Sequence, residues 1–420
     1  MGSWARNTFA AFSNRHFRVL WTGSFLAFIA FFMSTVVQSV VAFDLSGNNR
    51  AVGFVVFAQG IAQMGLGPLG GAMADRLSKK MVILTCQLAI FSVFVSLGVL
   101  VATGLIEVVW LALGSFVTGV SFSFLGPSRQ AWMLELVEGH RRGNAVALSQ
   151  VGLNASRIIA PMLAGVMLAV GFLGPAGAFF GMGALYVGAI TTTIVLPPAR
   201  PPAGSSRSVF GDIASGLKYV ANHGRLGRLV LSYVLTIMFG FTYITVLPGL
   251  VENELGRDAD SITLLLGANA VGGLAASIGV ASLADSPHAR TVYTTMCLVF
   301  GVSLLGMGFA PTYAALLGAM AVGGLGGGGF QTLNGAIVSH ITEPEYFGRV
   351  VSLTFLAFAS SSIFALPVGF LADAIGERPT IWATGGVVCG LTLAYWLLER
   401  AAGPGETGPA LAREAAAGGE

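Results

Sequence analysis

TVYTTMCLVFGVSLLGMGFAPTYAALLGAMAVGGLGGGGFQTLNGAIVSHIT, residues 291–342, contains no Asp, Glu, Lys or Arg. A helix needs about 20 mostly apolar residues to cross a bilayer, so this run is long enough for two spans. Its natural break is FAPTY at 309–313, where a proline interrupts the apolar sequence. The run therefore predicts two membrane-spanning helices joined by a short turn.

Long runs with few or no charged residues recur through the rest of the chain. Charged residues make up 10% of the 420 residues and apolar residues 55%, whereas ordinary soluble domains are about 25% charged. A second long run at 143–199 contains one charge, Arg157, and breaks at 171–177. Eight further runs fit one span each: 19–43, 51–74, 81–106, 108–128, 229–251, 261–284, 350–372 and 379–398. The pattern predicts an all-α integral membrane protein with twelve transmembrane helices.

Lysine and arginine residues are distributed unevenly between the two ends of these spans. With the N-terminus inside, 18 of the 22 basic residues lie in inner segments and three in outer loops, and Arg157 lies within a span. Basic residues accumulate on the cytoplasmic side of a membrane. We therefore expect both termini in the cytoplasm, an even number of spans and a location in the cell (inner) membrane.

The longest loop between spans divides the chain into two parts. It begins with the proline-rich segment PPARPPAGSSRS (197–208). Phe210, Ile213, Leu217 and Val220 then recur at helical spacing, which predicts a short helix on the inner membrane surface.

Two pairs of segments suggest that the chain contains an internal repeat. ELVEGHRRGNAVAL (135–148) is similar to HITEPEYFGRVVSL (340–353), and AMADR (72–76) is similar to SLADS (282–286), at nearly equal offsets. Transporters often consist of such repeats. We expect two pseudo-symmetric six-helix halves, at 1–197 and 229–400, joined by a cytoplasmic linker at 198–228. A disordered cytoplasmic tail is expected at 401–420.

One cytoplasmic loop has a specific family resemblance. GGAMADRLSKK (70–80) is similar to the loop signature of the major facilitator superfamily, Gly-x-x-x-Asp-Arg-x-Gly-Arg-Arg/Lys, with Ser78 replacing the second glycine. The resemblance to this superfamily covers roughly residues 15–400. GPSRQAWMLELV (126–137), GNAVALS (143–149) and the segment 329–353 resemble its subgroup of enterobactin-exporter and macrolide-efflux-like proteins.

The resemblance implies a secondary transporter that works by alternating access. It implies that the loop forms a latch on the cytoplasmic side, with Asp75 capping the N-terminus of span 11 near residues 348–352. Positive-inside charge alone is enough to explain the two lysines of this loop. The residues that match the latch are Gly71, Asp75, Arg76, Lys79 and Lys80.

Two positions depart from the pattern of proton-driven exporters. Span 5 keeps Pro161 and Gly165 of the exporters' Gly-Pro motif, but Ser156, Ala160 and Ala164 replace its other glycines. Small residues still allow close helix packing. Ser115 occupies the span-4 position where many proton-coupled relatives carry arginine, so coupling through that residue is not expected.

Arg157 is the only charge that the sequence places deep within a span. Such an arginine costs at least about 2.5–3.5 kcal/mol on insertion scales, so it must face the protein interior, a cavity or a partner. It either contacts an anionic part of the substrate or ties the spans together. The nearest plausible carboxylates are Asp44 and Asp373, at the outer ends of spans.

Other polar residues in or near the spans are candidates for function. Acidic residues at span ends are the expected proton carriers: Asp44, Asp75, Glu135 and Asp373. Uncharged residues either line the transport path or form hydrogen bonds between helices. They are Asn154, Gln38, Gln59, Gln63, Tyr243, Asn269, Gln331 and Asn334.

The sequence argues against several other kinds of site. GGLGGGGF (323–330) lacks the Lys-Ser/Thr of a phosphate-binding loop, and we expect Gly326 and Gly327 to allow close packing and bending of span 10. The cysteines and histidines lack metal-ligand or catalytic spacing. We therefore expect no metal, cofactor, nucleotide or nucleic-acid site, and no enzyme.

The favoured function is export of a small neutral or anionic amphipathic molecule, drug-like or siderophore-like, by a monomer in the lipid bilayer. Proton antiport is the expected drive. The alternatives are an importer or passive facilitator on the same scaffold and, less favoured, a non-transporting membrane sensor or scaffold.

Overall fold

The computed structural model describes residues 10–401 except 139–141, 170–173, 200–208, 258–260, 282, 284–285, 287 and 344–345. The side chains of some helical residues, including 68–76, also lie outside the described part. Every regular element among the described residues is a helix, in agreement with the predicted all-α class.

The helices follow one another with short connections. In chain order they are η1 (Ala10–Ser13), α2 (Arg15–Ser46), α3 (Asn49–Arg76), α4 (Lys79–Ala102), α5 (Val108–Leu136), α6 (Arg142–Ala169), α7 (Gly174–Val195), α8 (Val209–Asn222), α9 (Gly224–Gly240), α10 (Tyr243–Gly249), η3 (Leu250–Glu254), α11 (Ser261–Ala281), α12 (Ala289–Phe309), α13 (Tyr313–Ile341), α14 (Phe347–Ile375) and α15 (Glu377–Ala401).

Eleven helical segments in the described part are long and apolar enough to cross a membrane. One of them combines α9, α10 and η3 into a single segment, Gly224–Glu254. The span predicted at 51–74 coincides with α3, which is a helix of 28 residues but is not among the eleven. The chain is therefore a multi-pass membrane protein.

The break predicted within the charge-free run is present. Helix α12 ends at Phe309 and α13 begins at Tyr313. The Thr312 side chain accepts a hydrogen bond from the backbone N–H of Ala315 at 3.3 Å, which caps the new helix. The proline and this cap together explain why one apolar run forms two helices.

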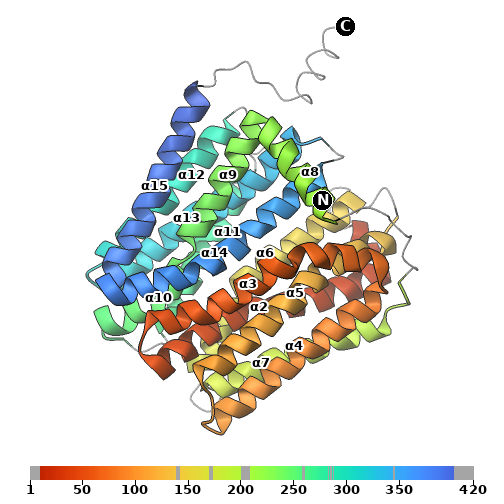
Figure 1. Ribbon diagram of the computed structural model, residues 1–420, viewed down its shortest axis with the longest axis horizontal. Coiled ribbons are helices and arrows are strands. Elements are labelled where there is room, and N and C mark those ends of the chain that lie inside the picture. The colour runs from red at the N-terminus through yellow and green to blue at the C-terminus, as the bar shows by residue number, and fades with distance from the viewer. Residues whose placement is uncertain are drawn as a thin grey trace. The chain divides into compact units, whose positions relative to one another are not determined.

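The first of two compact units comprises Met1–Ser46 and Ala58–Val209. Within it, α2 packs against α5, α6 and α7, and α4 packs against α5 and α7 (Figure 1). Helix α6 continues through Pro161, and Ala160 and Ala164 on either side are fully buried, as is most of Gly165. These small residues let neighbouring helices approach closely, which tolerates a proline within a membrane helix.

The second unit comprises Gly47–Phe57 and Phe210–Glu420. In its described part, α13 packs between α11 and α12, α15 packs against α12 and α9, and α14 packs against α9 (Figure 1). Helix α3 is therefore shared, because its first residues cluster with the second unit and the rest with the first.

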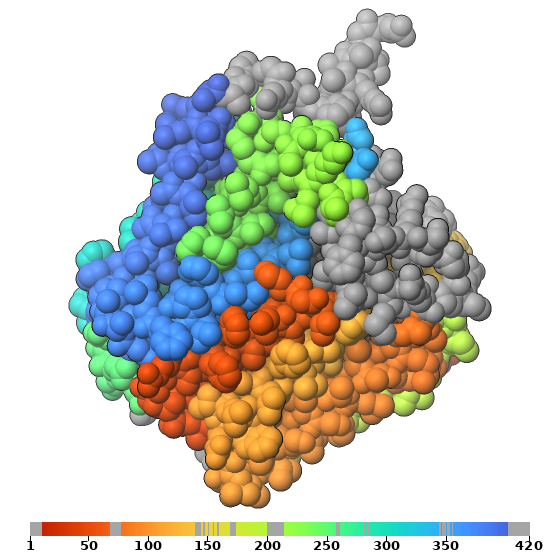
Figure 2. Space-filling model, viewed as in Figure 1, coloured from red at the N-terminus to blue at the C-terminus, as the bar shows by residue number. Residues whose placement is uncertain are grey.

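The outer surfaces of the helices are apolar, as expected for helices in contact with lipid. Leu393, Leu397 and Leu398 of α15 are each more than half exposed, and α15 forms the dark blue surface in Figure 2. In a soluble protein such a surface would be unfavourable, whereas lipid chains solvate it well.

The glycine-rich run of α13 contacts the backbones of two neighbouring helices. A Cβ on Gly326 would lie 2.5 Å from the backbone nitrogen of Phe300 in α12. A Cβ on Gly324 would overlap the backbone oxygen of Asn269 in α11. Gly327 has only ordinary contacts with Phe300. Close backbone packing therefore requires glycine at both Gly326 and Gly324.

The short helix predicted after residue 210 is present as α8, and it packs on the loop between α13 and α14. The Tyr219 hydroxyl accepts a hydrogen bond from the backbone N–H of Glu343 at 3.2 Å, and its ring stacks on Tyr346 at 4.1 Å. Burial raises the pKa of Tyr219, so the hydroxyl stays protonated at neutral pH.

Candidate substrate site

Helix α5 carries a charged residue into the interior of the first unit. Arg129 lies within α5, seven residues before its end, and only 5% of its surface is exposed. None of its three guanidinium nitrogens has a hydrogen-bond partner among the residues that the structure describes. The charge-free run predicted for this span ends at residue 128, whereas α5 extends past Arg129 to Leu136.

The Arg129 side chain reaches α2. Long helical side chains point towards the N-terminus of their helix. The Arg129 guanidinium carbon lies 5.6 Å from the ring centroid of Phe28 in α2. Phe28 is 13 residues into α2, roughly 20 Å along its axis at about 1.5 Å per residue.

Arg157 of α6 contacts α2 one turn further along from Phe28. Its guanidinium carbon lies 5.3 Å from the ring centroid of Phe32. Phe28 and Phe32 are four residues apart, so they occupy one face of α2. Two arginines from two helices therefore lie over adjacent phenylalanine rings, and we call Arg129, Arg157, Phe28 and Phe32 the two-arginine cluster.

The aromatic surroundings of the cluster extend onto α5. The Phe122 ring stacks on Phe31 with centroids 4.0 Å apart and meets Phe28 at 6.0 Å. Phe28, Phe32 and Phe122 are half-buried, as is Arg157. The cluster thus combines positive charge with partly accessible aromatic surface, which suits an amphipathic molecule.

No negative charge balances Arg129 among the described residues. Its electrostatic neighbours are the buried Tyr186 and Cys86, whose side chains are ordinarily neutral at physiological pH. A buried charge without a partner is costly. An anionic group entering beside Arg129 would supply the missing charge and the hydrogen-bond acceptors.

The other polar residues expected in the first unit differ in their environments. Gln38 is buried, its Oε1 accepts a hydrogen bond from Ser115 at 2.6 Å, and its Nε2 has no partner. Gln59 is buried and Gln63 half-buried. The side chain of Asn154 lies outside the described residues. Ser115 and Gln38 therefore link α5 to α2 in the same interior as the two-arginine cluster.

The polar residues expected in the second unit mainly join helices or cap their own turns. Asn269 donates to the backbone oxygen of Met320 at 3.0 Å, which links α11 to α13. Gln331 donates to Gly327 within its own helix at 3.0 Å. Asn334 is buried with its Oδ1 unpartnered, and Tyr243 is buried in α10.

The residues of the predicted cytoplasmic latch are only partly described. The side chains of Gly71, Asp75 and Arg76 lie outside the described residues, as do those at 348, 349, 351 and 352 of the proposed contact. Two lysines of the loop have partners within the first unit.

Lys79 forms an ion pair with Glu135 at 2.7 Å, and its side chain is 7% exposed. Lys80 donates to the backbone oxygens of Ile194 and Leu196, at 2.8 and 2.6 Å, at the C-terminus of α7. A cation is favourable at a helix C-terminus. Both lysines thus have partners in the first unit, and one of these partners is the carboxylate of Glu135.

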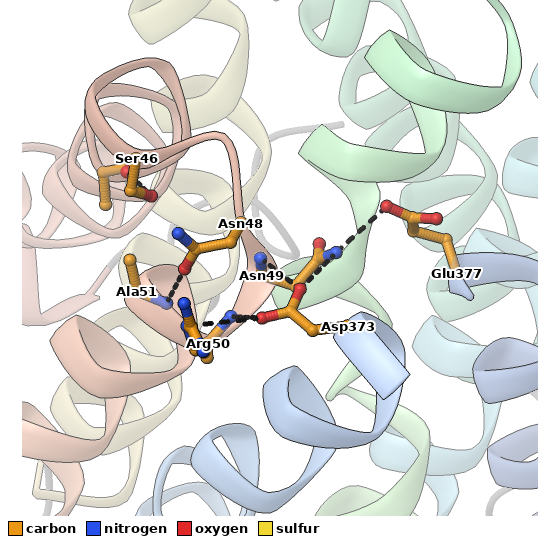
Figure 3. A network of polar contacts seen from close by, with 8 residues as sticks. Ser46, Asn48, Asn49, Arg50, Ala51, Asp373 and Glu377 are labelled. Atoms are coloured by element: carbon orange, nitrogen blue, oxygen red, sulfur yellow. Dashed lines mark hydrogen bonds and ion pairs between the residues drawn. The ribbon is translucent and has the colours of Figure 1, made fainter. Parts of the chain in front are cut away.

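Asp373, near the end of α14, caps the start of α3. It accepts hydrogen bonds from the backbone N–H groups of Asn49 at 2.8 Å and Arg50 at 3.1 Å (Figure 3). The Asn49 side chain also joins Glu377 at 3.0 Å, and Asn253 donates to the same carboxylate at 2.7 Å. All of these groups belong to the second unit. Asp44 is exposed at the end of α2.

Comparisons with known proteins agree with a transporter. The family described as transmembrane secretion effector, within the major facilitator superfamily, matches residues 6–397. The Staphyloferrin A transporter of Staphylococcus aureus is 21% identical over 393 residues, which cover 91% of this chain and 96% of that protein.

Two further similarities are more limited. The Quinolone resistance protein NorA of Staphylococcus aureus strain Mu50 is 28% identical over 197 residues, 47% of this chain and 48% of that protein. The crystal structure of the nucleoside transporter NupG superimposes with a TM-score of 0.73 at 13% identity, covering 91% of this chain and 99% of that one. The structural similarity establishes a shared fold.

Proposed function

The chain belongs to the transmembrane secretion effector family of major facilitator superfamily transporters, and we propose that it exports small amphipathic molecules that are anionic or neutral. The observation that supports this most strongly is Arg129, a buried cation without a partner beside half-buried phenylalanines. A cationic substrate would meet uncompensated positive charge at this point, whereas an anion would be attracted.

The relatives support the size and type of substrate. One is named as a siderophore transporter and another as a quinolone resistance protein. These names support a drug-like or siderophore-like molecule as cargo for this chain, and the second supports the outward direction. Substrate would be exchanged across the membrane by alternating access between two six-helix halves, with both termini in the cytoplasm.

Proton antiport is our proposed source of energy. Two of the expected proton carriers have partners, because Glu135 pairs with Lys79 and Asp373 accepts bonds from the start of α3. The expected proton carriers remain the acidic residues at span ends, Asp44, Asp75, Glu135 and Asp373. Import or passive facilitation on the same scaffold is the alternative.

Dye accumulation in cells with and without the gene tests the proposed function. We expect expressing cells to hold less of anionic and neutral amphipathic dyes, while cationic dyes of similar size are unaffected. A protonophore should abolish the difference. Higher accumulation of the anionic dyes would favour an importer, and lower accumulation of cationic dyes alone would contradict the proposed charge preference.

A further inference from the structure

Arg129 lacks what a purely structural arginine requires. A buried guanidinium has five N–H donors and normally pairs with carboxylates or backbone oxygens. Only 5% of the surface of Arg129 is exposed, and none of its side-chain nitrogens has such a partner in the described part of the chain. Its contact with Phe28 is with a ring face, which attracts a cation but does not satisfy its donors.

The second arginine stands at a defined spacing from the first. Phe28 and Phe32 are one helical turn apart, so the two guanidinium groups lie over points separated by about 6 Å along α2. Arg157 has five donors of its own, so it can hold an anionic group in addition to its existing contacts. Both arginines come from helices that pack on α2.

We propose that Arg129 and Arg157 form a two-point anion site that selects dianionic amphipathic substrates. One anionic group pairs with Arg129, a second pairs with Arg157, and the apolar body of the molecule packs on Phe28, Phe32 and Phe122. The proposal rests on the proposed transport function and specifies its substrate class. Carboxylate, sulfonate and phosphate groups all fit the planar donor arrangement of arginine.

Binding to the full-length protein in lipid nanodiscs tests the site without requiring transport. The probes are naphthalene-1,5-disulfonate, naphthalene-1-sulfonate and protonated 1-naphthylmethylamine, measured by isothermal titration calorimetry. They share an aromatic body and carry two negative charges, one negative charge and one positive charge. We expect the disulfonate to bind most tightly and the amine to show no binding.

Substitutions then separate the two arginines. Arg129→Gln should weaken disulfonate binding by at least about tenfold, the loss expected for a charge-assisted hydrogen-bond pair. Arg157→Gln should reduce disulfonate binding to the affinity of the monosulfonate while leaving monosulfonate binding largely unchanged. Arg129→Lys should retain part of the binding, because lysine keeps the positive charge but lacks the planar arrangement of N–H donors of arginine.

Arg400→Gln is the matched control. Arg400 also stacks on an aromatic ring, with its guanidinium carbon 3.8 Å from the Trp396 centroid, but it is exposed at the end of α15. Binding should be unchanged in this variant. Thermal unfolding of each variant establishes that it is folded.

Three results would overturn the inference: equal binding of the dianion and monoanion, unchanged disulfonate binding in Arg129→Gln, or no binding of either anion. Failure of this site is distinguishable from failure of the proposed function. A protein that lowers dye accumulation in cells but binds the disulfonate independently of Arg129 is an exporter with another substrate class. Arginine-dependent binding without any efflux would retain the site and reject export.

Discussion

Arg129 is a residue whose environment opposes stability, so its removal should have an unusual effect. Arg129→Met replaces an unpartnered buried cation by an apolar side chain of similar length. We expect the free energy of unfolding to rise by about 1–3 kcal/mol, the cost of burying an unsatisfied polar group. Thermal unfolding in detergent measures the change, while the same variant should lose disulfonate binding.

Arg400→Met is the control, because Arg400 is exposed and its loss removes only a surface contact with Trp396. Its unfolding temperature should change little. A marked loss of stability in Arg129→Met would instead make Arg129 a structural residue and would remove the main support for an anion site. A gain in stability with loss of binding is the pattern expected where function requires a strained site.

The sequence indicated that Arg157 faces the interior, but it did not indicate that Arg129 is buried. Arg157 interrupts a run that is otherwise free of charge, so the pattern placed it within a span. Arg129 lies at the edge of a charge-free run, where a basic residue is normally part of a cytoplasmic loop. A usable signal was present, because Trp132 and Met133 continue the apolar helix after Arg129, and both are buried.

At the scale of elements, close backbone contacts of α13 predict which glycines tolerate a side chain. A Cβ on Gly324 would overlap the backbone oxygen of Asn269, whereas one on Gly335 would meet no atom within 4 Å. We expect Gly324→Ala to lower the unfolding free energy by about 1–3 kcal/mol, as overpacking does. Gly335→Ala should be neutral or slightly stabilising, because alanine favours the helix.

Thermal unfolding of the two variants in detergent gives the comparison directly. Equal changes in unfolding free energy for the two variants would contradict the close approach of α13 to α11 at Gly324. The glycine-rich run itself indicated close packing from the sequence. Which glycines face a neighbouring backbone depends on how the helices are rotated, and the sequence pattern does not fix that rotation.

The cap on α3 is a second element-scale feature that can be tested. Asp373→Ala removes the carboxylate that accepts hydrogen bonds from Asn49 and Arg50. We expect faster hydrogen–deuterium exchange at residues 49–51 and a loss of about 1 kcal/mol in stability, as for other helix caps. Mass spectrometry of the exchanged protein locates the change.

Glu107→Ala is a suitable control for this cap. Glu107 precedes α5 and its side chain makes no capping hydrogen bond. Exchange at 49–51 should be unaffected by its loss, and unchanged exchange in Asp373→Ala would disprove the cap. Asp373 could be placed at a span end from the sequence. The sequence could not identify Asn49 as its partner, because residues 49 and 373 are brought together only by the packed fold.

At the scale of the whole molecule, the charge bias predicts the topology of the chain. A reporter fused after Asp285 should be cytoplasmic, and one fused after Asp258 external, because one span separates them and basic residues favour the inner side. Alkaline phosphatase and green fluorescent protein fusions report the two compartments. The same compartment for both positions would contradict the twelve-span arrangement.

The helical, multi-pass character and the transporter family could be predicted from the sequence, because both follow from long apolar runs and a matching loop signature. The sequence did not predict that α3 is divided between two compact units. Asn49, at its start, contacts residues more than 300 positions away, and the sequence pattern does not reveal such contacts. The burial of Arg129 depends on how α5 packs in the fold, so the sequence did not reveal it.

Uptake of naphthalene-1,5-disulfonate into everted membrane vesicles tests export of an anion through the two-arginine cluster. The inside of such vesicles corresponds to the outside of the cell, so export appears as uptake. With an imposed pH gradient, acidic inside, we predict uptake above the external concentration, measured by mass spectrometry after filtration. It should collapse with a protonophore and fall to background in Arg129→Gln, while Arg400→Gln transports normally. Equal uptake by Arg129→Gln and the unmodified protein, or no uptake above that of vesicles lacking the protein, would contradict the proposed mechanism.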